Sequence, residues 1–437
     1  MDVATIRTEG IGDSTYVLVH EGLAAVIDPQ RDIDRFERVL NETGADLRLV
    51  VETHIHNDYV SGGLDLARTT GADLVMPAGA APVFRHRPAF HNEDIELGPV
   101  AIRPIHTPGH TPEHMSYAVI VEGVVVAVFS GGSLLVGSAG RSDLLGAERA
   151  ETLARLQYGS VNRLAALPEE AGLYPTHGAG SFCSVAEASS ATSTIGAEKT
   201  SNPVLAYADE DAFVKGQLAD LVPYPAYYRY MGALNLTGLP QPDMDVPLLE
   251  TIPAGVTIVD ARDRHEFASG HLPGALGIGL GDSFGTWVGW LTEHNTPLVL
   301  ILDEDQDADE AIRQLIRIGY DDIRGIARNP QSGLVSYRTV GDDEYLEAVE
   351  AGAQLLDVRA PDEWDSGFIE GSTLSYLPHL VEKTPIGLDP DEPVWVVCGS
   401  GYRASIAASI LQDRGFEPVV LSHGGATDLL HRASKNP

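Results

Sequence analysis

The feature that most constrains the fold is an internal repeat in the C-terminal part of this 437-residue chain. Residues 260–274 and 357–371 share one pattern at an offset of 97, in which Asp-x-Arg is followed by a glutamate and two glycines. Further along, at an offset of 96, the apolar run 297–302 matches 393–398. Each copy reads as strand, loop, helix and glycine stop. The repeat therefore predicts two small α/β domains in tandem, each with a parallel sheet.

The repeat also indicates where the domains begin and end. In the second copy, the apolar strand 394–397 leads through a loop to a helix that carries Ile406, Ile410 and Leu411 before Gly415. The first 245 residues lack the repeat and alternate short β-rich runs with helical segments, which is enough chain for one larger domain. We therefore expect domains at residues 1–245, 246–335 and 336–437.

Charge and cysteine content restrict the partners and the compartment. Sixty-three acidic against 29 basic residues give a formal net charge of −34, which repels nucleic-acid phosphates and anionic lipid surfaces. No apolar run approaches the ~20 residues needed to span a bilayer, and the first residues show no export signal. With only Cys183 and Cys398 available for cross-linking, a reducing cytoplasm is the expected setting. The oligomeric state stays open, a homo-oligomer included.

Histidines gather at the ends of predicted strands in the first domain. His54 and His56 come directly after an apolar strand that ends at Val51, and their i, i+2 spacing on an extended segment points both side chains the same way. His110 follows a Pro-Gly turn, and His177 follows a short strand. A lone histidine at such a place is usually a satisfied polar group, but several together indicate a site for a borderline metal ion.

Short motifs around these histidines connect the first domain to a known family. They are Thr-His-x-His-x-Asp at 53–58, Gly-His-Thr at 109–111, Phe-Ser-Gly at 129–131 and Pro-Thr-His at 175–177. Together they resemble the metallo-β-lactamase superfamily, which implies an αββα sandwich with metal at one edge of the sheets. Residues 134–144 and 194–203 are similar to its persulfide dioxygenase branch. That resemblance implies oxidation of a thiol persulfide to sulfite with O₂ and one non-haem Fe(II) per chain.

The sequence departs from this family at two positions. The resemblance assigns the iron to His54, His110 and an aspartate, but Gly132 stands where the aspartate is expected. Tyr59 replaces a histidine that binuclear hydrolases of the superfamily use in their second metal site. The binuclear hydrolase alternative therefore loses two ligands.

The missing carboxylate leaves several ligand sets open. Two histidines and one carboxylate suit Fe(II), whereas two imidazoles alone hold it weakly. His56 would complete a three-histidine site of a kind better known for zinc, and Ser133 or a water is the alternative occupant. We predict His54, His56 and His110 as the metal ligands.

Arg141 and Cys183 are two further candidates in the first domain. Arg141 lies in the segment similar to persulfide dioxygenases, so it either pairs with an anionic group of a thiol substrate or forms a surface ion pair with an acid. We predict it as a substrate-binding residue. Cys183 has no basic neighbour in sequence, which favours a small buried side chain over a nucleophile.

A second candidate site is the loop from Cys398 to Arg403, between the strand and the helix of the second copy. The amides of the loop and the N-terminus of the helix converge on the sulfur and favour its thiolate form. Two glycines let the backbone curl around the sulfur, and the arginine adds a fixed positive charge. The predicted anion-binding residues of this loop are Gly399, Ser400, Gly401 and Tyr402.

The spacing Cys-x-x-x-x-Arg resembles the active loop of rhodanese. Residues 357–371 match the family's first motif, with Phe368 in place of its usual histidine. The resemblance implies that Cys398 is the nucleophile that carries sulfane sulfur as a persulfide and that Arg403 steadies anions. Phosphatase relatives share a six-residue loop that ends in arginine, but Gly-Ser-Gly-Tyr suits sulfur transfer better. A buried inert cysteine would explain neither the two glycines nor the arginine.

The first copy lacks this chemistry at the matching positions. Leu302 aligns with Cys398 and Asp307 aligns with Arg403, and the loop 302–307 carries four carboxylates that would repel anionic sulfur species. We expect a folded but inactive rhodanese that acts as a spacer or docking unit.

The whole chain is similar to bacterial fusions of a persulfide dioxygenase, an inactive rhodanese and an active rhodanese in sulfide detoxification. We expect oxidation of a low-molecular-weight thiol persulfide to sulfite, and transfer of sulfane sulfur between persulfide, sulfite and thiosulfate by Cys398. Two alternatives stay open, which are zinc-dependent thioester hydrolysis and a metal-free first domain. Metal analysis separates the three, and Gly132→Asp tests whether the missing carboxylate weakens iron retention.

Overall fold

Two six-stranded sheets form the framework of the first part of the chain. The computed structural model describes residues 1–184, 190–219, 221–328, 330 and 332–433. The first sheet has the order β1-β2-β3-β4-β5-β6, and the second has the order β14-β13-β10-β9-β8-β7. The strands of the first are β1 (Asp2–Thr8), β2 (Asp13–His20), β3 (Leu23–Ile27), β4 (Asp46–Val51), β5 (Asp73–Pro77) and β6 (Arg87–Ala89). Those of the second are β7 (Ile95–Leu97), β8 (Val100–His106), β9 (Met115–Val121), β10 (Val124–Gly131), β13 (Gly172–Pro175) and β14 (Ser193–Thr194).

The two sheets pack face to face because each has one apolar face. Buried side chains from both sheets, among them Tyr16, Val51, Tyr117 and Phe129, form one cluster between them. Alternation of side chains along each strand places a second apolar set on the outer faces, where helices cover it. Burial of this surface is the main force that holds the sandwich together.

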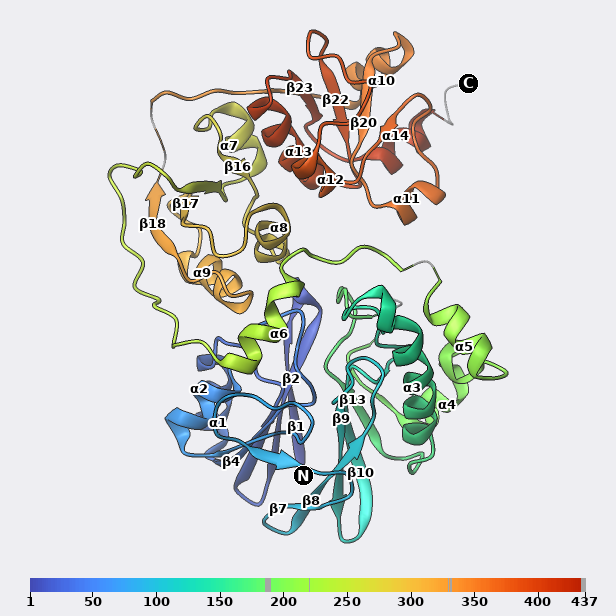
Figure 1. Ribbon diagram of the computed structural model, residues 1–437. Coiled ribbons are helices and arrows are strands. Elements are labelled where there is room, and N and C mark those ends of the chain that lie inside the picture. Colours follow the sequence, from blue (N-terminus) through green and yellow to red (C-terminus); the bar gives the residue numbers. More distant parts are fainter. Residues whose placement is uncertain (185–189, 220, 329, 331, 434–437) are drawn as a thin grey trace. The chain divides into compact units, whose positions relative to one another are not determined.

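Helices complete the four layers (Figure 1). They are α1 (Asp34–Thr43), α2 (Gly63–Thr70), α3 (Ala147–Ala165), α4 (Ile195–Ser201), α5 (Glu210–Gln217) and α6 (Tyr228–Thr237), with short elements η1 (Glu9–Ile11), β11 (Leu134–Leu135), β12 (Ser138–Ala139) and η2 (Pro203–Leu205). Helices α1 and α2 pack on the first sheet through Phe36 and Leu66. Helices α3 and α5 pack on the second sheet through Val161 and Phe213. The expected αββα sandwich is confirmed.

The second part of the chain holds two parallel sheets, one for each copy of the repeat. The first copy has the order β16-β15-β17-β18 and the second has the order β19-β23-β22-β20-β21, with every pair parallel. Elements of the first copy are β15 (Thr257–Asp260), α7 (Arg264–Ser269), β16 (Leu276–Gly277), α8 (Phe284–Leu291), β17 (Leu298–Leu302), α9 (Ala308–Arg317) and β18 (Ile323–Arg328). Those of the second are β19 (Arg338–Val340), α10 (Asp342–Glu350), β20 (Gln354–Asp357), α11 (Pro361–Asp365), β21 (Thr373–Leu374), α12 (His379–Glu382), β22 (Val394–Val397), α13 (Tyr402–Asp413), β23 (Pro418–Leu421) and α14 (Ala426–Ala433). The predicted tandem of parallel α/β units is confirmed.

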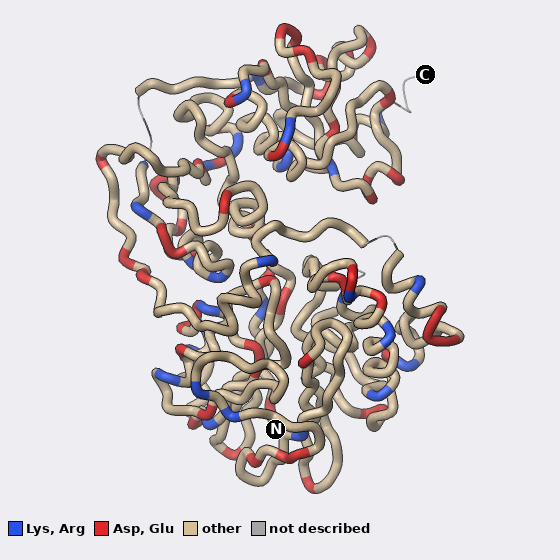
Figure 2. The backbone as a smooth tube through the Cα atoms, viewed as in Figure 1, with Lys and Arg blue, Asp and Glu red and all other residues tan. Residues whose placement is uncertain are grey.

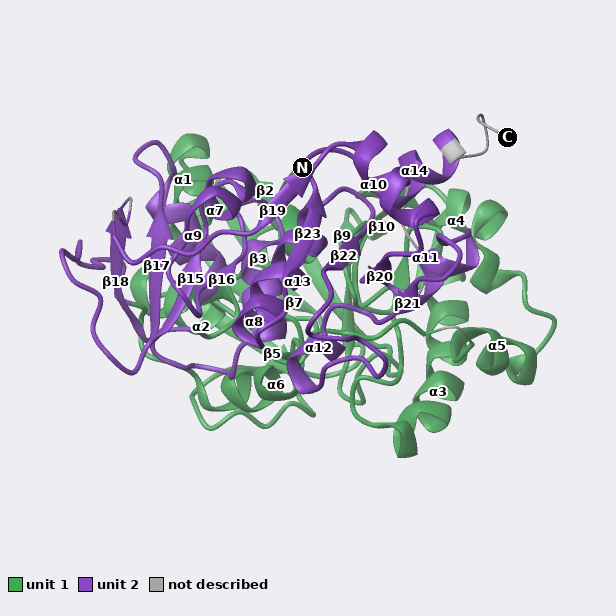
Figure 3. Cartoon of the chain, turned by 90° about the horizontal axis from the view of Figure 1, so that it is seen from above, with its two compact units in different colours: residues 1–242, 316–319 green, residues 243–315, 320–437 purple. Residues whose placement is uncertain are grey.

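The contacts divide the chain into two compact units (Figure 3). Unit 1 contains residues 1–242 and 316–319, and unit 2 contains residues 243–315 and 320–437. The predicted boundaries within the second half stay predictions. The 63 acidic residues outnumber the 29 basic residues, and aspartate and glutamate are spread over both units (Figure 2). In the described part of the chain, no helix has the length and apolar character needed to cross a membrane.

Candidate metal centre and cysteine loop

Three histidine rings converge at one end of the sheets of unit 1. His54 lies just after β4, His110 lies between β8 and β9, and His177 follows β13. Each residue is at most 1% exposed. One ring nitrogen from each lies within 4.8 Å of the other two, and the Nε2 atoms of His54 and His177 are 3.4 Å apart. Strand ends therefore bring together imidazoles that are far apart in the sequence.

Hydrogen bonds at Nδ1 orient two of these rings. Nδ1 of His110 lies 2.8 Å from the backbone carbonyl of Arg141, and Nδ1 of His177 lies 2.8 Å from Oδ1 of Asp13. A carbonyl or an ionised carboxylate can only accept, so each Nδ1 carries the hydrogen. In a neutral ring the lone pair is then on Nε2. This is the usual arrangement of a metal-binding histidine, in which the second nitrogen donates to an oxygen.

The third ring has the same tautomer for a less direct reason. Nδ1 of His54 lies 2.8 Å from the Thr53 hydroxyl. That hydroxyl donates its only hydrogen to Oδ2 of Asp28 at 2.7 Å, so the ring nitrogen has to be the donor in the other bond. The lone pair of a neutral His54 is therefore also on Nε2.

Burial sets the charge of the cluster. Burial and the neighbouring rings lower the pKa of His54 well below its usual value, and burial lowers the pKa of His110 to about 3. Both rings are neutral, which is the form that binds metal. Burial alone would lower the pKa of His177 too, but the carboxylates of Asp13 and Asp58 outweigh it and raise the pKa to about 10. Metal bound at His177 therefore displaces a proton.

One further observation indicates that these donor atoms suit a metal ion. Nε2 of His110 is fully buried and has no hydrogen-bond partner in the described part of the chain. A buried lone pair without a donor costs free energy unless a ligand uses it. Once His177 has lost its proton, the three imidazoles in this arrangement can hold a divalent ion and leave coordination positions open for substrate.

His56, the third predicted ligand, makes different contacts. Its Nε2 lies 3.1 Å from Oε2 of Glu52, 3.3 Å from Oδ1 of Asp28 and 3.0 Å from the Tyr59 hydroxyl. Burial alone would lower the pKa of His56, but the two carboxylates raise it well above its usual value. A protonated ring at either His56 or His177 has to lose a proton before it binds metal, so charge does not separate the two. The geometry favours His177, because it forms a group with His54 and His110 whose ligand atoms lie within 4.8 Å of one another, and in the described part of the chain His56 forms no such group with those two residues.

Two other groups of ligand atoms also lie within 4.8 Å of one another. One joins Asp28 with His54 and His56, and the other joins Asp58 with His56 and His177. Both need a nitrogen of His56. Its Nε2 is engaged by carboxylates, while its Nδ1 is buried without a hydrogen-bond partner in the described part of the chain. The set His54, His56 and His110 stays a prediction.

Gly132, at the position of the family aspartate, packs directly on His110. A Cβ atom there would lie 2.2 Å from Cδ2 of that ring. The Gly132 N–H donates to Nε2 of His114 at 2.9 Å, and Nδ1 of His114 lies 2.9 Å from the Thr107 hydroxyl. Backbone and imidazole thus fill the place of the missing carboxylate, and Gly132→Asp would have to displace His110. Ser133 has a buried hydroxyl without a hydrogen-bond partner in the described part of the chain.

Arg141 forms a buried ion pair. Its Nε and Nη2 each lie 2.7 Å from an oxygen of Asp143, and its Nη1 donates to two backbone carbonyls. The side chain is 2% exposed, so the guanidinium does not face an open substrate site. This geometry favours the ion-pair interpretation, although the pair is internal rather than at the surface.

Cys183 is a buried thiol next to the histidine cluster. Its Sγ lies 3.4 Å from Oδ2 of Asp58. Burial, with Asp58 and Asp13, raises the pKa of the thiol well above its usual value. This agrees with the small buried side chain expected from the sequence.

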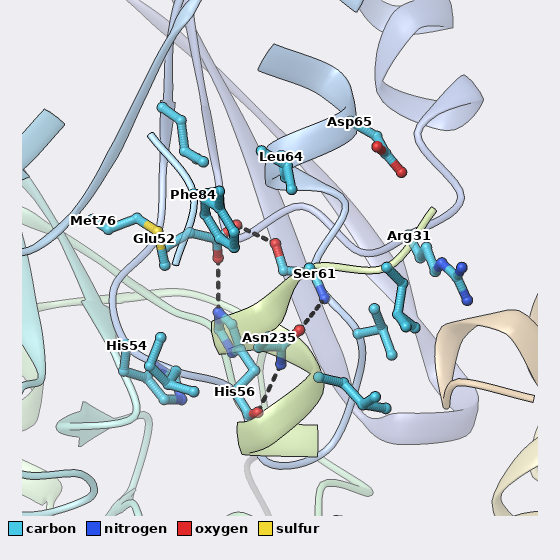
Figure 4. A pocket seen from close by; sticks show the side chains of 16 residues that line it. Arg31, Glu52, His54, His56, Ser61, Leu64, Asp65, Met76, Phe84 and Asn235 are labelled. Atoms are coloured by element: carbon cyan, nitrogen blue, oxygen red, sulfur yellow. Dashed lines mark hydrogen bonds and ion pairs between the residues drawn. The ribbon is translucent and has the colours of Figure 1, made fainter. Parts of the chain in front are cut away.

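A narrow pocket lies beside the centre, on the side of His56 (Figure 4). Glu52 accepts hydrogen bonds from His56 and Ser61 there, and Asn235 donates to the His56 carbonyl. The cavity has a volume of about 20 Å³, which is room for one water molecule. The residues that line this pocket hold the ring of His56 in place, and the cavity is too small for a substrate.

The loop of the second copy surrounds its cysteine with amides. Cys398 follows β22 and is 1% exposed. Its Sγ accepts from the N–H of Gly401 at 3.1 Å and from the N–H of Ala404 at 3.3 Å. Gly401 has φ +85°, a conformation that favours glycine. The predicted convergence of loop amides and helix N-terminus on the sulfur is present, and N–H groups so placed can donate to an anionic ligand as well.

The remaining loop residues lie in three different environments. Arg403 forms a two-point ion pair with Glu363, and one N···O distance is 2.8 Å. The Tyr402 hydroxyl donates to the carbonyl of Gly279, in the first copy, at 2.8 Å. Ser400 is exposed and Gly399 is half-buried at the surface of the loop.

The matching loop of the first copy satisfies its own polar groups. Leu302 is fully buried at the end of β17. The Asp303 N–H donates to the Gln306 side chain at 2.9 Å. Asp307 caps α9 by accepting from the N–H of Asp309 at 3.0 Å. Each of these side chains therefore has a structural role in the first copy.

Comparison with known proteins agrees with this division of the chain. Residues 8–177 match the metallo-beta-lactamase superfamily, and residues 248–327 and 342–431 each match the rhodanese-like domain. These assignments coincide with the αββα sandwich and with the two parallel sheets.

Curated relatives match the first domain. A hydroxyacylglutathione hydrolase from Methylobacillus flagellatus is 29% identical over 168 residues, which cover 38% of this chain and 62% of that protein. One from a Methylobacterium species is 30% identical over 176 residues, or 39% of this chain and 63% of that protein. The chain thus spans less than two thirds of the length of these relatives.

Among solved structures, a metallo-beta-lactamase from Staphylococcus aureus subsp. aureus COL matches a larger part of the chain. It has a TM-score of 0.69 and 28% sequence identity, and the match covers 76% of this chain and 99% of that one. The likeness therefore extends beyond the first domain. The chain consists of a metallo-β-lactamase-superfamily domain followed by two rhodanese-like domains, and these domain types indicate an enzyme.

Proposed function

We propose that the protein oxidises a low-molecular-weight thiol persulfide to sulfite in its first domain and transfers sulfane sulfur at Cys398 in its last. The observation that carries the proposal is the coexistence of two sites. One is a cluster of three imidazoles with their Nε2 atoms turned together, and the other is a cysteine whose sulfur accepts two loop amides. A metal domain joined to a sulfur carrier suits chemistry on persulfides.

The residues that would hold the metal are His54, His110 and His177. When Fe(II) is bound there, it supplies the activation of O₂ that oxidation of sulfane sulfur requires. Asp13 and the Arg141 carbonyl keep two of the rings in the binding tautomer. The buried surroundings exclude bulk water, which protects a reactive sulfur species.

The overall reaction balances without a further reductant. A persulfide RSSH with O₂ and H₂O gives RSH and HSO₃⁻ with release of one H⁺, so the outer sulfur loses the four electrons that O₂ gains. At the second site, the Cys398 persulfide gives its outer sulfur to sulfite, which forms thiosulfate and regenerates the thiolate. The N–H groups of Gly401 and Ala404 donate to Sγ and would stabilise the thiolate that this step regenerates.

Anaerobic purification, elemental analysis and an oxygen electrode test this proposal. We expect about one iron per chain and uptake of O₂ with glutathione persulfide or coenzyme A persulfide, in equal amounts to the sulfite formed. His177→Gln should lower metal content about tenfold or more, while His56→Gln should retain most of the metal. Circular dichroism of both variants controls for folding. Equal metal loss in the two variants would contradict the assignment of His177.

A second candidate function is hydrolysis of a thioester by a zinc ion at the same three histidines. Two observations favour it, since a three-histidine donor set is known for catalytic zinc and the relatives of the first domain are named hydroxyacylglutathione hydrolases. Zinc in the purified protein with cleavage of a glutathione thioester, and no persulfide-dependent O₂ uptake, would replace the first proposal by this one.

A further inference from the structure

One arginine of the first rhodanese-like domain reaches the cysteine loop of the second. Arg264 is the first residue of α7, and its Nη2 donates to the carbonyl of Ser422 at 2.7 Å. A Cβ atom on Gly401 would lie 1.8 Å from its Nη1. The guanidinium therefore occupies the space that a side chain on Gly401 would need. Both residues belong to unit 2.

The guanidinium lies close to the reactive sulfur. The N–H of Gly401 donates to Sγ of Cys398 at 3.1 Å, and Nη1 of Arg264 adjoins the same glycine. These contacts place the positive charge within about 8 Å of the sulfur. Arg264 is half-buried, so its field is screened less than that of a fully exposed charge.

Arg264 and Arg403 differ in whether a carboxylate neutralises their positive charge. Arg403 is paired with Glu363 at two points, so much of its charge is neutralised before any anion arrives. In the described part of the chain, Arg264 has backbone carbonyls as its hydrogen-bond partners and no carboxylate within ion-pair distance. Carbonyls leave the net charge intact, and the remaining guanidinium N–H groups can bind an oxyanion.

A second contact ties the first domain to the same loop. The Tyr402 hydroxyl donates to the carbonyl of Gly279 at 2.8 Å. The domain without a cysteine thus holds the residue that follows Gly401 and places a cation beside Gly401 itself. This arrangement gives the inactive copy a part in the chemistry of the active one.

We propose that Arg264 is a specificity-determining residue that attracts and binds the oxyanion of sulfite or thiosulfate at the mouth of the Cys398 loop. The proposal deepens the sulfur-transfer function and rests on it for the identity of the ligand. It assigns the first rhodanese-like domain a substrate-binding role in place of the spacer role expected from sequence.

The first test measures charge at the sulfur and needs no turnover. Cys398 in the full chain is alkylated with neutral iodoacetamide or with anionic iodoacetate, and mass spectrometry measures the rate of each reaction. The quantity compared is the rate with iodoacetate divided by the rate with iodoacetamide. Arg264→Gln removes one positive charge at this distance and should lower this ratio about fivefold. Arg264→Lys should keep most of the ratio. Arg324→Gln, which removes an exposed arginine of the same domain, should leave it unchanged.

The second test measures sulfur transfer from thiosulfate to cyanide. Arg264→Gln should raise KM for thiosulfate about tenfold and change kcat less than threefold, whereas a supporting role for the loop would lower kcat and the thermal midpoint together. An unchanged alkylation ratio overturns the inference whatever the activity. If the wild-type protein transfers no sulfur but the ratio still falls in Arg264→Gln, the proposed function fails while the charge at the loop is established.

Discussion

The two rhodanese-like domains share a framework and differ in one loop. Both keep a buried aspartate and arginine two residues apart at the end of their first central strand. In the first domain Arg262 pairs with Asp260 at 2.6 Å, and in the second Arg359 pairs with Asp357 at 2.7 Å. Each arginine also donates to a glycine carbonyl eight residues on. The shared framework thus lies outside the loop, and the two domains differ in the six residues within it.

The loops differ in where their polar groups are directed. In the second domain, two amides point at a sulfur and remain available to an anion. In the first, Gln306 accepts the N–H of Asp303 and Asp307 caps the following helix. A loop that satisfies its own donors does not offer them to an anion. The first domain therefore keeps the fold without the cysteine and the arginine of the second domain's loop.

The largest expected effect is on sulfur-transfer activity. It comes from substitutions at Cys398 and at Leu302, which align at the start of the two loops. Cys398→Ser should lower sulfur transfer about 10⁴-fold or more, because the nucleophile is removed. The matched variant Leu302→Cys should add no activity, since its loop carries four carboxylates and no arginine. Thiocyanate formation from thiosulfate and cyanide measures both. Substantial activity in Cys398→Ser would mean that the comparison misplaces the active domain.

A smaller effect is expected on stability, and it should be equal in the two domains. Arg262→Met and Arg359→Met each leave a buried aspartate without its partner, which costs about 3 to 5 kcal/mol. All four tryptophans lie in these two domains, at Trp287 and Trp290 in the first and Trp364 and Trp395 in the second. Urea unfolding followed by tryptophan fluorescence therefore reports on them alone. If only one of the two substitutions lowered the free energy of unfolding, the two frameworks would not be equivalent.

Sequence patterns predicted the parts of the molecule that depend on local periodicity. The repeat predicted two parallel sheets, because strands and helices are encoded by spacing within a few residues. The sandwich was predicted through the resemblance of the histidine-bearing motifs to a known family. The loop at Cys398 was found for the same reason. Its cysteine, glycines and arginine are contiguous, so their geometry follows from one turn of chain.

The metal centre was harder to predict because its contacts are long-range. The spacing of His54 and His56 suggested a shared role, but Asp28, 28 residues before His56, engages the second ring. The packing of His110 on Gly132 has no sequence signal, and His114 was missed although it follows His110 by four residues. Arg141 is different, since its partner Asp143 is two residues away and was visible in the sequence.

The smallest expected effect comes from the glutamate that the two domains share at matching positions. Glu363 pairs with Arg403, whereas Glu266 is exposed and the matching loop of its domain contains no arginine. Burial alone would raise the pKa of Glu363, but Arg403 holds it below its usual value, so the carboxylate is ionised at neutral pH. Glu363→Gln removes that negative charge and returns the full charge of Arg403 to the loop.

We therefore expect Glu363→Gln to lower KM for thiosulfate two- to fivefold, with a stability change below about 1 kcal/mol because the pair is partly exposed. Glu266→Gln is the matched control and should change neither quantity, since Glu266 is exposed and Asp307 stands at the position of Arg403 in its domain. Steady-state kinetics at low ionic strength give the clearest reading, because salt screens the charge that the substitution releases. A rise in KM for Glu363→Gln would instead mean that the carboxylate positions Arg403 for the anion, and the glutamate would then belong to the active loop rather than oppose it.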